Sequence, residues 1–178
     1  MIEQHLPAGT AVVRAMPNTA ASVGRGVTAL AGGTHASEEQ LSLVRELFSA
    51  AGAVLEVPEE LLDAVTAVSG SGPAYFFLMA EALARAAEHL GLDAQQARLL
   101  ARHTLIGAGA QVDASPVSLE EQRRRVTSPN GTTHAGVTVL QDGELDSLIL
   151  RAATAARDRS RQLGTATPTA LSESSPPR

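Results

Sequence analysis

Residues 53–68 read AVLEVPEELLDAVTAV, and within this stretch a β-strand pattern gives way to a helical one. The apolar run Ala53–Val57 is typical of a short strand, and Pro58 ends it because proline has no N–H for the ladder. Glu59 and Glu60 then open a helix, since acidic side chains in a first turn interact favourably with the helix dipole. We therefore predict a domain boundary near Pro58.

The sequence before this boundary is typical of an α/β domain. Two more short strands are predicted at Ala11–Ala15 and Val27–Leu30, and Ser37 with Gln40 forms a capping-box pair that starts a helix. Three strands are too few for a parallel sheet covered on both faces. Residues 1–58 are therefore interpreted as an incomplete α/β part.

Residues 59–164 show helical patterns and no predicted strand, so the fold class is α+β, with an all-α second domain. Gly107 and Gly109 lie inside a predicted helix from Asp93 to about Val112, where each costs roughly 1 kcal/mol against alanine. They indicate a face that another helix backbone approaches. Residues 165–178 have no periodicity and are expected to be disordered.

Composition excludes several classes of protein. The chain has 14 basic and 19 acidic residues, a net charge of −5, which argues against a nucleic-acid binder. The absence of cysteine rules out disulfides, thiolate zinc sites and a cysteine nucleophile. The five histidines include no pair spaced for a helical metal site, and no apolar run is long enough to span a bilayer. We expect a soluble cytoplasmic protein without a metal.

Three motifs favour structural interpretations. Gly24–Ala29 matches a dinucleotide-binding pattern, but it opens a predicted strand with no helix behind it, so we predict a turn. Ser69–Pro73 lacks the glycine spacing of a nucleophile elbow and is interpreted as a helix break that permits close backbone approach. Arg123–Arg125 follows Glu120–Glu121 at helical spacing, which favours a solvated ion-paired face, although an anion contact by one arginine is an alternative.

The strongest chemical signal is VTSPNGTT at Val126–Thr133. Pro129 fixes one turn residue, Asn130 and Gly131 tolerate positive φ, and a helix is predicted to start directly afterwards. Orphan amides at a helix start form a cradle for a small anion such as a carboxylate, while helix capping by a nearby hydroxyl is the alternative. The amides expected to lack a partner are those of Gly131, Thr132 and Thr133.

Three blocks, Arg14–Thr19, Ser69–Tyr75 and Val126–Thr133, together resemble pyrroline-5-carboxylate reductase in order and spacing. The resemblance implies reduction of 1-pyrroline-5-carboxylate to L-proline with NADPH or NADH, the last step of proline biosynthesis. It also implies that residues 1–58 are the end of a Rossmann domain and that residues 59–164 form a helical dimerisation and substrate-binding domain. Such domains interlock into homodimers, often assembled further into decamers.

The resemblance also implies roles for individual residues. Thr133 would offer its hydroxyl to the ring nitrogen of the substrate as the catalytic residue. The other substrate-binding residues implied are Glu59, Pro73, Ser128, Asn130, Gly131 and Thr132. The cofactor-binding residues implied are Arg14, Ala15, Met16, Asn18 and Arg125.

The sequence departs from the family pattern in three ways. Asn130 stands where glycine is usual, and Arg125 where an amide side chain is common. The first strand, the Gly-rich turn and the ribose-recognising residue are not in this sequence. We therefore expect a truncated or mis-started chain that binds NADPH weakly or not at all.

Two other functions stay open. One is a non-catalytic helical dimerisation module that uses the same fold only to assemble. The other is a hydroxyacid-type dehydrogenase, which would be favoured by a lysine in Ala74–Leu90, and that helix has none.

Overall fold

The computed structural model describes residues 2–165 and shows two compact units. One unit comprises the residues up to Ser71 together with those from Arg151 onward, and the other is Gly72–Leu150. The predicted boundary at Pro58 falls inside the first unit. The predicted disordered tail lies outside the described residues, apart from Thr165, which ends the last helix.

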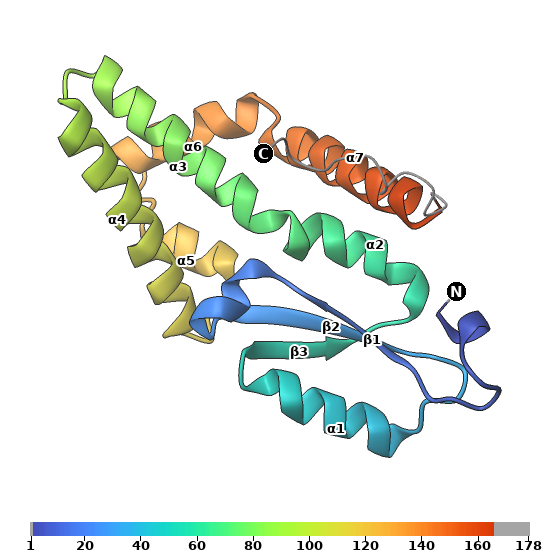
Figure 1. Cartoon of the computed structure of the whole chain (residues 1–178). Helices are drawn as coiled ribbons and strands as arrows, with labels where there is room; N and C mark the ends of the chain where they lie inside the picture. Colours follow the sequence, from blue (N-terminus) through green and yellow to red (C-terminus); the bar gives the residue numbers. More distant parts are fainter. Residues whose placement is uncertain (1, 166–178) are drawn as a thin grey trace, which may run out of the picture. The chain divides into compact units, whose positions relative to one another are not determined.

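The first unit is built on a sheet of β1 (Val13–Pro17), β2 (Gly26–Gly32) and β3 (Gly52–Glu56), in the order β1-β2-β3 (Figure 1). β1 runs antiparallel to β2, to which the 3₁₀ turn η2 (Thr19–Val23) joins it, and β2 runs parallel to β3. The three predicted strands are thus confirmed, with ends shifted by one or two residues.

Helical elements cover both faces of this sheet. Helix α1 (Glu38–Ser49) begins at the capping box predicted for Ser37 and Gln40, and it packs on one face (Figure 1). On the other face, Leu62 forms the core with Ala29 and Ala31. Because side chains alternate along a strand, Thr28 and Leu30 point to the α1 side, where both are buried. This layering explains why β2 is the most buried element.

The helical segment 59–70 differs from the predicted helix. It consists of a 3₁₀ turn η3 (Glu59–Leu61), a short α2 (Leu62–Val65) and a π-helical turn η4 (Thr66–Gly70), in which the Ser71 N–H donates to the Thr66 carbonyl at 2.8 Å. The predicted break at Ser69–Pro73 is present as a bend at Ser71, between this π-helical turn and the next helix, which begins at Gly72. The expected close backbone approach is not found at Gly70, because the atom 3.0 Å from a Cβ there is the side-chain atom Met16 Cε.

The last helix, α7 (Leu145–Thr165), contributes its later residues to the first unit. Ser160 Oγ donates to Asp63 Oδ1 at 2.6 Å, and Arg161 Nε lies 3.7 Å from the other oxygen of the same carboxylate. Asp63 thus fixes the last turns of α7 to α2. Gly164 lies inside the last turn of α7.

The second unit consists of helices. α3 (Gly72–His89) and α4 (Ala94–Asp113) lie side by side, and Asp93 with Gln96 forms a capping box at the start of α4. α5 (Leu119–Arg125) is capped by Ser118, and α6 (Thr132–Asp142) follows the Val126–Gly131 turn. After α6, Glu144 adopts the left-handed conformation (φ 55°). Among residues 2–165, no helix is long and apolar enough to cross a membrane.

Gly52 allows β3 to start beside β2, and its replacement tests the sheet. Its φ is +140°, and a Cβ there would overlap the carbonyl oxygen of Gly26 on β2. We expect Gly52→Ala to lower the free energy of unfolding by roughly 1–3 kcal/mol, measured by urea denaturation. Gly164→Ala is the control, because that helical glycine has an open surrounding and should gain up to about 1 kcal/mol. Equal stability of the two variants would contradict the strained geometry.

Candidate functional site

Alternate residues of β1 contact the helical segment 59–70 within the first unit. Arg14, Met16 and the following Asn18 share one face of the strand because side chains alternate with a period of two. Arg14 pairs with Glu59, Met16 packs beside Gly70, and Asn18 bonds Ser69. We call these six residues the β1 cluster. It gathers three of the four β1 residues predicted to bind cofactor and one residue predicted to bind substrate.

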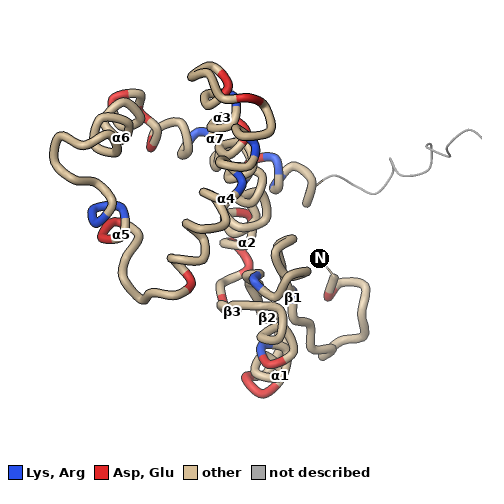
Figure 2. The backbone as a smooth tube through the Cα atoms, turned by 90° about the vertical axis from the view of Figure 1, so that its left-hand side faces the viewer, with Lys and Arg blue, Asp and Glu red and all other residues tan. Residues whose placement is uncertain are grey.

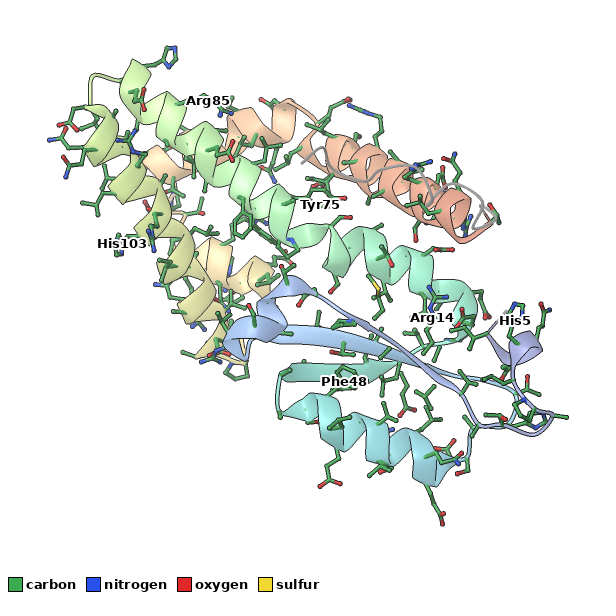
Figure 3. All side chains as sticks on the ribbon, viewed as in Figure 1. His5, Arg14, Phe48, Tyr75, Arg85 and His103 are labelled. Atoms are coloured by element: carbon green, nitrogen blue, oxygen red, sulfur yellow. The ribbon has the colours of Figure 1, made fainter. Side chains whose placement is uncertain are left out.

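Arg14 and Glu59 form an ion pair in which both side chains are about half exposed (Figure 3). Exposed pairs of this kind contribute at most about 1 kcal/mol because water screens them. Their functional groups are already engaged with one another. Arg14 also lies at the opposite end of β1 from Asn18, about 13 Å away at the usual rise of a strand.

Asn18 lies at the carboxyl end of β1 and joins two elements. Its Oδ1 accepts from the Val27 N–H at 3.2 Å, and its Nδ2 donates to the Ser69 carbonyl at 3.4 Å. The second distance is at the limit of a hydrogen bond. Ala15, the remaining predicted cofactor residue on this strand, is paired with Leu30 across the sheet and points to its other face.

Ser69 is a residue of interest that the sequence did not single out. Its hydroxyl oxygen is buried and is the one such side-chain atom without a hydrogen-bond partner in the described part of the chain. Such an atom costs stability, because burial removes its water without supplying a replacement. The only signal in the sequence was the serine–glycine run, which also fits a simple break.

A cavity of about 550 Å³ lies at the amino end of β1. Arg14, Glu59 and Glu3 line it, with Gly33 and Thr34. Glu3 accepts from the Thr34 N–H at 2.7 Å and from its hydroxyl at 3.1 Å, which fixes the 3₁₀ turn η1 (Glu3–His5). Each charged group in this cavity therefore has a partner on the protein.

In the second unit, the Val126–Gly131 turn has the predicted backbone in part. Asn130 adopts φ 58°, the left-handed conformation that the sequence indicated. The Gly131 N–H was expected to lack a partner, but it donates to the Ser128 carbonyl at 3.0 Å inside the turn. Gly131 instead serves as the N-cap in an extended conformation, and no side chain caps the helix. The capping alternative by Ser128 or Thr132 is thus not formed.

The start of α6 leaves three amides free. Within residues 2–165, the N–H groups of Thr132, Thr133 and His134 have no acceptor. These donors lie at the positive end of an 11-residue helix, and the hydroxyl-bearing side chains of Ser128, Thr132 and Thr133 are exposed around them. Such an arrangement binds anions, since both the amides and the dipole favour negative charge.

Arg125 and Pro73 belong to the same unit as this turn. Arg125 Nε lies 3.0 Å from Glu121 Oε1, and Arg124 Nε lies 2.6 Å from Oε2, so the ion-paired face predicted for α5 is confirmed. Figure 2 shows the acidic and basic positions next to one another along α5. Hydrogen bonds from Arg124 and then Arg125 lower the pKa of Glu121 from 4.5 to about 2. Pro73 is the second residue of α3, a position where its missing N–H costs nothing.

Metal ligation finds no support in the part of the chain that the structure covers. No group of three or more His, Cys, Asp or Glu side chains lies close enough together there to hold an ion.

Comparison with known proteins identifies relatives along most of the chain. Residues 59–163 match the family described as pyrroline-5-carboxylate reductase dimerisation. The pyrroline-5-carboxylate reductase of Mycobacterium tuberculosis is 49% identical over 178 residues, which cover 90% of this chain and 60% of the relative. That of Synechocystis is 47% identical over 154 residues, covering 86% and 58%. The chain thus spans about three fifths of the length of these relatives.

Solved structures give the same result. A pyrroline-5-carboxylate reductase from Coxiella burnetii superposes with a TM-score of 0.86 at 41% identity, over 91% of this chain and 60% of that one. The pyrroline carboxylate reductase of Plasmodium falciparum, solved with NADP bound, gives a TM-score of 0.78 at 27% identity, over 92% and 63%. The expected fold, an incomplete Rossmann part followed by a helical domain, is thereby confirmed.

The Glu121 pair yields a prediction about pH. Because its pKa in the folded chain is below the ordinary value, the pair is complete above about pH 4.5 and is lost as the pH falls towards 2. We expect NMR titration of the Glu121 carboxyl carbon to show a midpoint near 2, and Arg124→Gln to move it towards 4.5. Arg123→Gln is the matched control and should leave the midpoint unchanged. A parent midpoint near 4.5 would show that the pair does not form in solution.

Proposed function

Because this chain belongs to the pyrroline-5-carboxylate reductase family, we propose that it is the substrate-binding and dimerisation part of a reductase that forms L-proline. The substrate is 1-pyrroline-5-carboxylate, a small cyclic imine with a carboxylate, and the reductant is NADPH or NADH. The observation that carries the proposal is the start of α6, where three amides without acceptors and exposed hydroxyls suit a carboxylate. The compartment proposed for the reaction is the cytoplasm.

The turn recognises the substrate by its negative charge. The N–H groups of Thr132 and Thr133, with the Ser128 hydroxyl, hold the carboxylate at the positive end of α6. Asn130 and Gly131 contribute through their backbone conformations. The left-handed Asn130 and the extended Gly131 turn the chain so that these donors face outward. Pro73 is assigned to the ring side of the substrate, as the resemblance of the Ser69–Tyr75 block implies. The site thus selects a planar anion at one end and an apolar ring at the other.

Chemistry at the ring then needs little acid–base machinery. The nicotinamide, when bound, supplies a hydride to the carbon of the C=N bond, and the nitrogen takes up one proton. The Thr133 hydroxyl hydrogen-bonds this nitrogen, which orients the imine and assists its protonation. Holding the carboxylate and the nitrogen together fixes the reacting carbon, and that restriction lowers the barrier.

The carboxyl end of β1 is the place proposed for the nicotinamide. Ligands of α/β sheets bind beyond the carboxyl ends of strands, and Met16 and Asn18 lie there beside the unpartnered Ser69 hydroxyl. Ala15 supports them from within the sheet. Arg14 and Glu59 act at a distance in this proposal, because their ion pair holds the helical segment 59–70 on β1. Arg125 also acts at a distance, because its pair with Glu121 stabilises α5 itself, directly before the turn.

The helical domain is proposed to form a homodimer, and the homodimers are proposed to assemble further into a decamer. Large apolar side chains are exposed along α3 and α4, and a Cβ at Gly107 or Gly109 would have no neighbouring side chain or other element within 4 Å among the described residues. The exposed apolar residues include Phe76, Phe77, Leu83, Leu99 and Ile106. An uncovered apolar face of this kind is stabilised by a partner helix.

Substitution of Thr133 tests the reductase. We expect Thr133→Ala to lower kcat by about 10²-fold, because a donor to the reacting nitrogen is lost. Turnover is measured in the chain extended at its amino end by the nucleotide-binding half of the Mycobacterium tuberculosis relative. Thr132→Ala is the control, since it keeps the amide and should change kcat less than about threefold. Full activity of Thr133→Ala would remove its catalytic role, and an inactive extended parent would favour the non-catalytic module.

The dimer is tested at Gly107. We expect Gly107→Leu to convert a dimer into a monomer in light-scattering chromatography, because a large side chain blocks close approach of a second helix backbone. Gly107→Ala should weaken the dimer less. Circular dichroism verifies that both variants stay helical. An unchanged dimer in Gly107→Leu would place the interface elsewhere.

A further inference from the structure

The buried hydroxyl of Ser69 lowers the stability of the fold and makes no hydrogen bond in return within residues 2–165. Its oxygen is without a partner among the described residues, although it sits in a helix where carbonyls are close by. An alanine at this position would avoid the cost, since a buried donor without an acceptor is unfavourable. A π-helical turn presents this serine, and such turns occur often at functional sites.

Ser69 also carries a weakly held acceptor. Its carbonyl oxygen accepts a hydrogen bond from Asn18 Nδ2 at 3.4 Å, which is the long limit for such a bond. One residue therefore offers a free O–H donor and a carbonyl whose present bond is easily exchanged. A primary carboxamide, with one C=O and one NH₂, is the chemical complement of this pair. The group that now occupies the carbonyl, the side chain of Asn18, is itself a primary carboxamide.

We propose that Ser69 binds the carboxamide of a nicotinamide ring, with its hydroxyl donating to the carboxamide oxygen and its carbonyl accepting from the carboxamide nitrogen. The inference rests on the proposed function, which places the ring at the carboxyl end of β1. It assigns to Ser69 a contact that the sequence blocks did not indicate.

The surroundings allow the exchange. Asn18 releases Nδ2 while its Oδ1 stays on the Val27 N–H at 3.2 Å, so the end of β1 keeps its stronger bond. Gly70 adds no side chain beside Ser69, and Met16 Cε closes the apolar side of the turn. A nicotinamide ring needs polar partners only for its carboxamide, since the faces of the ring are apolar.

The first experiment measures stability without ligand. If the hydroxyl is kept for a ligand, Ser69→Ala unfolds at the same temperature as the parent or at a higher one. The matched control is Ser22→Ala, whose exposed hydroxyl donates to the Thr19 carbonyl at 2.9 Å and should change the melting temperature little. A lower melting temperature for Ser69→Ala, with Ser22→Ala unchanged, would show a structural hydroxyl and overturn the proposal.

The second experiment measures recognition with nicotinamide mononucleotide and nicotinic acid mononucleotide, which differ in the carboxamide. Both are titrated at millimolar concentration into the chain and followed by NMR. The parent should prefer the carboxamide by about five- to tenfold, the factor of one neutral hydrogen bond, and Ser69→Ala should lose this preference. Ser69→Thr, which keeps a hydroxyl, should retain it.

The outcomes separate the two proposals. If the parent prefers the carboxamide and Ser69→Ala does so equally, the role of Ser69 is wrong while the proposed nicotinamide site stands. If the parent binds neither mononucleotide, the site at the end of β1 fails, and the role of Ser69 fails with it.

Discussion

The docking of β1 on the helical segment 59–70 is the constraint on which the first unit depends. Four residues from Arg14 to Asn18 advance about 13 Å along a strand, and ten residues from Glu59 to Ser69 advance about 15 Å along a helix. The two elements therefore stay in register from the ion pair at one end to the Asn18 bond at the other. Between these ends, Met16 packs on the core around Leu62. Polar contacts fix the ends, and apolar burial stabilises the middle.

Local structure was predictable because its causes lie within a few residues. Both capping boxes and the left-handed Asn130 follow from side-chain chemistry three residues or fewer away. The contacts of Arg14, Asn18 and Asp63 were not predictable, since their partners lie 45, 51 and 97 residues distant. The π-helical turn was missed for another reason: serine and glycine weaken a helix equally whether it breaks or widens.

The candidate anion site and the β1 cluster are built by different means. At α6 the donors are backbone amides, so their position depends on the backbone angles of Asn130 and Gly131 more than on any one side chain. In the β1 cluster the donors and acceptors are side chains that already bond each other. A ligand joins the first site without displacing protein, whereas it must exchange a bond in the second. The sequence therefore indicated the first site more completely.

The contacts of Asp63 with Ser160 and Arg161 affect how the chain folds during its synthesis on the ribosome. Residues 72–150, which form a unit of their own, emerge from the ribosome before the first unit receives its last helix. The entropic cost of closing a loop grows only slowly with its length. The contact with Asp63 is therefore delayed by the time needed to synthesise the intervening residues more than by the entropic cost of closing the loop. Until then Asp63 lacks its partners, and the outer side of α2 is open to chaperones or to a neighbouring nascent chain.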